Sequence, residues 1–395
     1  MSIVFGLQTK INELESEMQE EVVNKCADPE SLLRLLGDRI SSDDSYMSKP
    51  TNPHTVRKSD LVRRFDAKKV EAFLRLFSVK RGRKDFCYYT DANPMTRRPL
   101  VELSEGAFFL TFRPWIIEAI YDFLNDTISR VDSFAHNKGA AVEEMAFDLL
   151  HKAFGDEAKY YRNVCEAPKT NEHDMLITYG NYIFVVEIKG SKVRPPAFNP
   201  EKSYTAVRDH FCGSNGIGGA YQQAIKLKKF IELAPAVTLY AEHKNPFVLS
   251  SVNKRIIPIV LTLEFFGSLE INTSDLIEPE EGQPYPWACC LDDLENLIRV
   301  NEYLSKDPDE FIRYINFRVK HHSMILASDE LEIQESFYNN AFKRHAFDRY
   351  ILCPMGNLLI DKIYFEEKGV PYDYKFSISV EPITDTQEYE TTWQR

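Results

Sequence analysis

The chain has 395 residues, of which 44% are hydrophobic, 12% aromatic and 27% charged. These fractions are typical of folded globular proteins and exclude the disordered and collagen-like classes. The length suits two or three domains of roughly 100 to 200 residues, and the formal net charge of −12 argues against non-specific nucleic-acid binding by the chain as a whole.

The seven cysteines are scattered along the chain and form no C-x-x-C pair. The sequence therefore predicts reduced thiols, and neither a disulfide framework nor a structural zinc site. The first residues show no basic region followed by a long apolar core, and no apolar run reaches the ~20 residues of a membrane-spanning helix. We therefore expect a cytoplasmic protein with no membrane partner.

Residues 1–131 are predicted to form a mainly helical N-terminal domain. Residues 1–40 carry Leu, Ile and Val at three- and four-residue spacing, and a polar stretch follows at 41–55. Residues 57–84, here called the basic segment, contain eleven Lys and Arg residues and three acids, so their net charge is +8. Part of this segment, RRFDAKKVEAFLRLF, has the apolar spacing of an amphipathic helix.

An alternation of helix and strand patterns begins near Asp132 and predicts an α/β core over residues 132–290. Its expected elements are a helix at 138–154, a hairpin at 175–188, a helix at 219–233 and a strand at 255–265. Helical patterns from Leu291 onward and short strand patterns from Tyr350 predict a smaller α+β region over residues 291–395.

The predicted hairpin lies in the stretch HDMLITYGNYIFVVEIKG, residues 173–190, with Gly and Asn at the turn. Because side chains alternate along a strand, Glu187 and Lys189 are expected on one face and Ile188 on the opposite face. The reversal of the chain also brings Asp174 close to Glu187. Three ionisable groups are thus predicted to converge at one edge of an apolar sheet.

Two carboxylates and an amine in this arrangement suit phosphodiester hydrolysis. Neighbouring carboxylates repel each other unless a divalent cation lies between them, and Mg²⁺ prefers oxygen ligands. Lys189 can orient or help to deprotonate the attacking water and offset charge on the phosphate. The simpler interpretation is an exposed E-x-K ion pair, worth less than ~1 kcal/mol, and the position of Asp174 across the turn favours a site instead.

Two helices supply further candidates. Glu143 lies at the edge of an apolar helical stripe, whereas Glu144 lies on the opposite side. An acid at the border of a buried face is costly without a partner, so Glu143 is the better candidate. The apolar stripe next to Glu143 comprises Val142, Ala146, Leu149 and Ala153. On the later helix, Gln223 lies beside that helix's own apolar stripe, whereas Gln222 faces away.

The order of these motifs along the chain resembles that of the PD-(D/E)xK nuclease superfamily, in particular its nuclease-related-domain type. The resemblance covers residues 137–266, about a third of the chain: a helix with G-x-x-x-E, then Asp174, then E-x-K, then a helix and a strand. It implies a restriction-endonuclease-like core, in which helices flank a mixed central sheet. His173 stands where the family has Pro, at a position that varies widely in the superfamily.

The resemblance also implies a role for each residue. Asp174, Glu187 and the Ile188 carbonyl would bind Mg²⁺, or Mn²⁺ in its place. Glu143 would support the metal site and Lys189 would assist the nucleophilic water. A glutamine-bearing helix follows E-x-K in some relatives, so Gln223 is expected at the site. The implied activity is endo- or exonucleolytic cleavage of DNA, in defence against foreign DNA or in repair.

A nuclease must hold a polyanion, and contacts from Lys and Arg to phosphates supply most of the affinity that does not depend on sequence. The alternative for such residues is a solvated helix face. No helicase or ATPase motif is present, so an energy-driven function would need a partner ATPase, and a homo-oligomer is also left open. The residues assigned to nucleic-acid binding are Arg63, Arg64, Lys68 and Lys69 in the basic segment and Lys226 in the core.

Two other functions stay open at the level of sequence. The first is a nucleic-acid-binding or scaffold protein with an inactive nuclease core, although the complete set of Asp174, Glu187 and Lys189 argues against it. The second is an RNA nuclease, which would use the same chemistry as a DNA nuclease. Sequence alone does not separate the two substrates.

Overall fold

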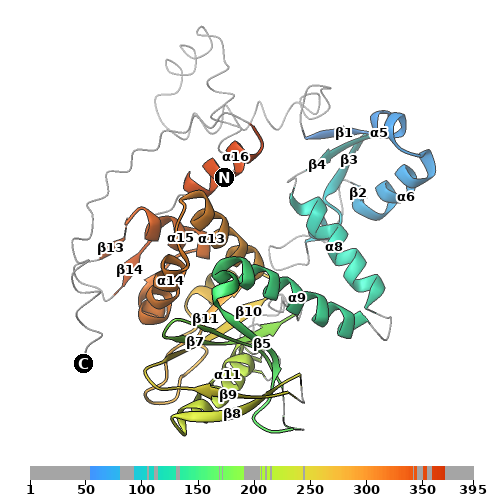
Figure 1. The fold of residues 1–395 in the computed structure, drawn as a ribbon. Coiled ribbons are helices and arrows are strands. Elements are labelled where there is room, and N and C mark those ends of the chain that lie inside the picture. The colour runs from blue at the N-terminus through green and yellow to red at the C-terminus, as the bar shows by residue number, and fades with distance from the viewer. Residues whose placement is uncertain are drawn as a thin grey trace, which may run out of the picture. The chain divides into compact units, whose positions relative to one another are not determined.

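The structure, a computed structural model, forms two compact units, residues 1–131 and 132–395, which divide at the first boundary expected from the sequence. Figure 1 shows the elements of each unit. The described residues are 54–80, 93–104, 106–110, 114–129, 134–168, 170, 172–190, 205, 207–209, 211–213, 216–242, 245–340, 342–344, 350–353 and 358–369. Residues 1–40, predicted as helical, and residues 81–84 of the basic segment lie outside them.

The described part of the first unit contains a four-stranded sheet in the order β1-β4-β3-β2. The sheet accompanies the helices of a domain that the sequence predicts to be mainly helical. The sequence does not predict this sheet, because strands of three to five residues are too short to show a clear alternation. The strands are β1 (Thr55–Arg57), β2 (Ser78–Lys80), β3 (Leu100–Ser104) and β4 (Ala107–Leu110). The helices are α5 (Lys58–Arg64), α6 (Ala67–Phe77), α7 (Pro94–Arg97) and α8 (Pro114–Ile128).

The described part of the basic segment contains two helices, α5 and α6, where its apolar spacing predicts one, and it ends in strand β2. α5 ends at Arg64, and the Lys69 N–H donates a hydrogen bond to Asp66 Oδ1 at 3.1 Å, which caps α6. Phe65, at the break between them, is 61% exposed. α6 buries Val70, Leu74 and Phe77 in the core of this unit. The basic residues exposed here include Arg63, Arg64, Lys68 and Lys69.

The second unit is built around a mixed sheet of five strands in the order β11-β10-β7-β6-β5. β5, β6 and β7 form an antiparallel meander, whereas β10 runs parallel to β7 and β11 parallel to β10. The β7–β10 pairing extends to the end of both strands, where Lys189 lies opposite Thr262. The strands are β5 (Lys159–Val164), β6 (His173–Tyr179), β7 (Tyr182–Lys189), β10 (Arg255–Thr262) and β11 (Trp287–Cys290).

Helices cover both faces of this sheet (Figure 1). α9 (Phe134–Phe154) packs on one face, against β7 residues such as Phe184 and Val186. α11 (Ile217–Glu232) and the hairpin of β8 (Ala236–Ala241) and β9 (Asn245–Ser250) pack on the other. β7 is therefore buried on both faces, as its continuous apolar run predicts. The fold is mixed α/β, and no described helix is long and apolar enough to span a membrane.

The helices after residue 291 share the core beneath α9 instead of forming one of their own. The ring of Phe311 lies 5.1 Å from that of Phe154 at the end of α9. Because α9 packs against the helix that carries Phe311, Leu150 and Phe154 are the buried residues of α9 here, and the predicted stripe residues Leu149 and Ala153 are only partly buried. The predicted region 291–395 is thus continuous with the core wherever it is described.

The remaining elements of the second unit are short or peripheral to the sheet. They are η1 (Gly155–Glu157), α12 (Ser268–Ile271), α13 (Leu291–Tyr303), α14 (Pro308–His321), η2 (His322–Met324), α15 (Glu330–Tyr338) and α16 (Leu358–Glu367), with the small strands β12 (Ile325–Leu326), β13 (Lys343–Arg344) and β14 (Ile351–Leu352). α13 and α14 cover α9, and α15 and α16 pack on α13.

Several buried acids lie among these C-terminal helices. Glu330 pairs with the guanidinium of Arg318 at 2.9 Å, and both side chains are 1% exposed. Burial raises the pKa of Glu270 to about 8, with a further contribution from the charge of Asp293. Burial likewise raises the pKa of Asp293 to about 7. Burial thus favours the neutral forms of Glu270 and Asp293.

The hydroxyl of Thr262 shows how a protonated Glu270 is accommodated. The hydroxyl oxygen lies 2.9 Å from the carbonyl oxygen of Glu264 and 3.1 Å from Glu270 Oε1. A hydroxyl has one proton to donate, and the shorter distance directs it to the carbonyl. A protonated Glu270 can then donate to the hydroxyl oxygen, so the neutral form satisfies both groups.

We predict that the free energy of unfolding falls as the pH rises from about 5 to about 8. Since folding raises the pKa of Glu270 from 4.5 to about 8, the folded chain keeps a proton that the unfolded chain releases. This stabilisation is complete below the unfolded pKa and is lost as the pH rises through the folded one. Urea unfolding at about pH 5, 6.5 and 8 measures it.

Glu270→Gln should flatten this dependence, because the amide supplies a donor to Thr262 at every pH. Glu278→Gln is the matched control, since Glu278 is exposed. Equal pH slopes for the wild type and Glu270→Gln would contradict the assignment.

Candidate active site

The candidate site forms where β7 leaves the apolar sheet. Gly180 and Asn181 join β6 to β7, and the φ of Gly180 is 51°, as a tight hairpin turn requires. Ile188 packs in the core beneath α9. Because side chains alternate along the strand, Glu187 and Lys189 lie on the α11 side of the sheet. The two residues thus share a face, as expected from the sequence.

Lys189 contacts α11 through Gln223. Its Nζ donates a hydrogen bond to Gln223 Oε1 at 2.9 Å, and both residues are partly buried. The bond fixes the ammonium group at the end of β7 and leaves its charge in place, because an amide is uncharged. Gln222, the preceding residue on the helix, is exposed. Gln223 is therefore the glutamine that reaches the candidate site.

Asp174 lies beside the end of β7. The hairpin pairing at this end stops at Met175 and Val186. Beyond it, the Ile188 N–H donates to Asp174 Oδ2 at 2.6 Å, so a carboxylate takes the place of a backbone carbonyl. Burial raises the pKa of Asp174, although the Ile188 N–H and the charge of Lys189 oppose the change. The residue is thus fixed where the sequence places it, next to E-x-K.

Glu143 on α9 interacts electrostatically with Asp174. Burial raises the pKa of Glu143, and the charge of Asp174 raises it further. Glu144, the next residue, is exposed and pairs with Arg162 at 2.7 Å. The structure therefore brings Glu143 toward the candidate site and turns Glu144 away, in agreement with their positions on the predicted helix.

His173, which has no role in the sequence prediction, contacts Glu187 directly. Its Nδ1 lies 2.7 Å from Glu187 Oε1, and the two side chains are 2% and 1% exposed. Burial raises the pKa of Glu187, and its bond to His173 only partly offsets this. Burial lowers the pKa of His173, but the hydrogen bond and charge of Glu187 outweigh burial, so that pKa is raised.

An irregularity in β5 explains why His173 reaches this face. Arg162 lies on the α9 side, with its guanidinium 5.2 Å from the centre of the Phe147 ring. Val164, two residues later, belongs to the core on the α11 side. Asn163 between them has a positive φ of 49°, which reverses the alternation. His173 pairs with Val164 and therefore lies on the same face of the sheet. A hydrophobic pattern does not reveal a positive φ, so it does not predict this position of His173.

Lys226, predicted to contact phosphates, pairs with an acid in the structure. Its Nζ lies 3.1 Å from Glu166 Oε1, and its side chain is 59% exposed. The same oxygen of Glu166 lies 3.5 Å from His173 Nε2. Burial raises the pKa of Glu166, but the bond to Lys226 and the charge of His173 outweigh it, so that pKa is lowered. Glu166 and His173 thus connect Lys226 to Glu187.

The acids of the site fit a divalent cation by their chemistry, because carboxylate oxygens are the ligands that Mg²⁺ prefers. A cation would also relieve the raised pKa values of Glu143, Asp174 and Glu187. Across the described residues, however, no three His, Cys, Asp or Glu side chains converge as a metal cluster. One oxygen of Glu187 faces His173, and one of Asp174 accepts from Ile188.

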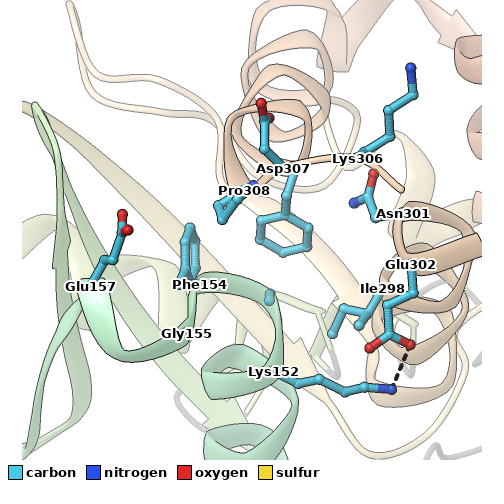
Figure 2. A pocket seen from close by; sticks show the side chains of 12 residues that line it. Lys152, Phe154, Gly155, Glu157, Ile298, Asn301, Glu302, Lys306, Asp307 and Pro308 are labelled. Atoms are coloured by element: carbon cyan, nitrogen blue, oxygen red, sulfur yellow. Dashed lines mark ion pairs between the residues drawn. The ribbon is translucent and has the colours of Figure 1, made fainter. Parts of the chain in front are cut away.

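The pocket drawn in Figure 2 lies elsewhere in the second unit, between the end of α9, the end of α13 and the start of α14. Its volume is about 340 Å³. Apolar side chains such as Phe154 and Ile298 line it, and Lys152 pairs with Glu302 at 2.8 Å at its edge. None of the residues predicted from the sequence to act in catalysis or nucleic-acid binding lines this pocket.

The chain matches no protein-family model, no curated protein and no solved structure. Function is therefore inferred from the residues and their arrangement. The informative features are a buried central strand that ends in Glu187 and Lys189, the adjacent Asp174, and the partly buried Glu143 beside them.

Proposed function

We propose that the protein is a metal-dependent nuclease of the PD-(D/E)xK type, with a restriction-endonuclease-like core. One observation carries the proposal: Asp174, Glu187 and Lys189 meet at one end of β6 and β7. The order of elements also supports it, because helix α9, the meander β5–β7, helix α11 and the parallel strand β10 come in the same order as in that core, with the β8–β9 hairpin between α11 and β10.

In this proposal Asp174 and Glu187 hold Mg²⁺ or Mn²⁺, with Glu143 in support. When bound, such a cation lowers the pKa of water and stabilises charge on a phosphate. The carboxylates contribute oxygen ligands on a site that the sheet and two helices keep rigid. The resemblance implies the Ile188 carbonyl as a further ligand. The N–H and the carbonyl of a strand residue point to the same side, so this carbonyl would face the side on which the Ile188 N–H binds Asp174.

Lys189 is assigned to the attacking water. Gln223 holds its ammonium group by a hydrogen bond of 2.9 Å that does not neutralise it, so the positive charge can orient the water and offset charge on the phosphate. An acidic partner would have cancelled much of that charge. The neutral Gln223 is thus a suitable holder for a lysine that must act on an anionic substrate.

DNA is the proposed substrate, and RNA uses the same chemistry. The exposed positive charges of α5 and α6 are suited to a phosphate backbone. A cytoplasmic location, defence against foreign DNA or DNA repair, and a homo-oligomer or partner ATPase all belong to this proposal as what the resemblance implies.

A specific observation favours an inactive nucleic-acid-binding protein as the second candidate. Glu187 is 1% exposed and directs one oxygen to His173, and the described acids do not converge as a metal cluster. This arrangement of Glu187 is compatible with a nuclease-like core that no longer binds a metal. Such a protein would bind nucleic acid and leave it intact.

Cleavage assays separate the two candidates. Purified protein is incubated with plasmid, linear and single-stranded DNA and with RNA, in Mg²⁺, Mn²⁺ or EDTA. We predict cleavage that requires the metal and falls by about 10²-fold or more in Glu187→Gln and in Lys189→Ala, because each removes a group proposed to act in the reaction. Gln223→Ala should reduce the rate less.

Gln222→Ala and Glu144→Gln are matched controls, because these residues neighbour Gln223 and Glu143 in sequence but face away. Both should retain the wild-type rate. Equal cleavage by the wild type, Glu187→Gln and Lys189→Ala would refute the assigned site, and binding without cleavage in any metal would favour the inactive candidate.

A second experiment tests the nucleic-acid-binding residues. Replacing Arg63, Arg64, Lys68 and Lys69 together by Gln should weaken DNA binding at low salt by about tenfold or more. The plot of log affinity against log salt should become shallower by roughly 0.9 for each phosphate that the variant no longer neutralises. Fluorescence anisotropy at several salt concentrations in EDTA measures both without cleavage.

A quadruple variant with the same charge change elsewhere is the control. Four exposed lysines of the second unit serve for it: Lys159, Lys320, Lys362 and Lys368. Unchanged affinity and salt slope in the first variant, or equal reductions in both variants, would show that α5 and α6 are an ordinary solvated surface.

A further inference from the structure

A chain of contacts leads from Glu187 to the surface of α11. Glu187 Oε1 lies 2.7 Å from His173 Nδ1, His173 Nε2 lies 3.5 Å from Glu166 Oε1, and that oxygen lies 3.1 Å from Lys226 Nζ. Exposure increases along it, from 1% at Glu187 and 2% at His173 to 9% at Glu166 and 59% at Lys226. A buried carboxylate is thus linked to solvent through alternating groups.

The chain is incompletely satisfied, which distinguishes it from an ordinary buried network. Buried polar groups in folded proteins nearly always have hydrogen-bond partners. Among the described residues, Glu166 Oε2 and His173 Nε2 are buried and have no hydrogen-bond partner, and the 3.5 Å between His173 Nε2 and Glu166 Oε1 exceeds a normal hydrogen bond. A network that served packing alone would be expected to close this gap. The unsatisfied atoms of His173 and Glu166 lie next to Glu187, the acid proposed to bind a cation.

We propose that His173 is a positioning residue for the metal site, an inference that rests on the proposed nuclease function. By donating from Nδ1 to Glu187 Oε1, it fixes the rotation of that carboxylate and reserves Oε2 for the cation. Ligating carboxylates are commonly held by such outer hydrogen bonds, and loss of an outer partner typically costs 10- to 100-fold in metal affinity. Glu166 faces the far side of the imidazole and keeps the ring in place.

This proposal reassigns Lys226. The lysine anchors Glu166, and its charge is directed to that acid at 3.1 Å instead of to a phosphate. Lys226→Gln should therefore weaken metal binding slightly and leave DNA affinity in EDTA unchanged. The basic segment, in contrast, should affect DNA affinity and not metal binding.

The experiment measures Mn²⁺ binding to the 395-residue chain without nucleic acid, from the electron paramagnetic resonance signal of free Mn²⁺. His173→Leu removes the donor, and we predict that Mn²⁺ affinity falls by about tenfold or more. His173→Asn places an amide N–H at the position of Nδ1, and affinity should return to within about threefold of the wild type. Glu166→Gln should give a smaller reduction than His173→Leu.

His322→Asn is the matched control. His322 is also 1% exposed, and its Nε2 accepts a hydrogen bond from the Thr273 N–H at 2.9 Å, away from the site. This variant should lower the melting temperature but keep the wild-type Mn²⁺ affinity. If His173→Leu does not fold, the rescue by His173→Asn is replaced by the comparison of Glu166→Gln with His322→Asn.

The outcomes separate this inference from the proposed function. Wild-type affinity in His173→Leu, or in Glu166→Gln where the former does not fold, would overturn the positioning role while leaving a nuclease that binds Mn²⁺ and cleaves. An equal reduction in His322→Asn would overturn it as well, because it would reveal general destabilisation. A wild-type protein that neither binds Mn²⁺ nor cleaves nucleic acid would overturn the proposed function and the inference together.

Discussion

The burial of β7 on both faces is the constraint on which the rest of the second unit depends. Its side chains enter the α9 core and the α11 core alternately, so there is no solvated face to receive a charge. A strand of this kind can end in Glu187 and Lys189 only if neighbouring elements supply partners. His173 and Gln223 meet that need, and both lie on elements that the sheet holds in place.

The same constraint gives the site its chemical character. Burial raises the pKa of Glu187 and of Asp174, and nearby acids raise them further, so these carboxyl groups gain from any positive charge that reaches them. His173 offers one such partner from inside the protein. A divalent cation would be another, and the two can act on different oxygens of Glu187. Under the proposed function, the histidine and the cation would together order one carboxylate.

Local periodicity was sufficient to predict much of the site, because it depends on one helix or one strand at a time. It distinguished Gln223 from Gln222 and the half-buried Glu143 from its neighbour, and it gave the hairpin. It did not give His173, because the positive φ of Asn163 reverses a strand face without changing the hydrophobic pattern. The packing of α13 and α14 on α9, and the short strands of the first unit, depend on contacts between distant segments that periodicity does not encode.

A crystal structure of the protein soaked in Mn²⁺, with anomalous diffraction at the manganese edge, would show whether Asp174 and Glu187 bind a cation. We expect one strong peak bonded to Asp174 and to Glu187 Oε2, with His173 Nδ1 still within hydrogen-bond distance of Glu187 Oε1. No peak at saturating Mn²⁺, or a peak that contacts neither Asp174 nor Glu187, would contradict this expectation.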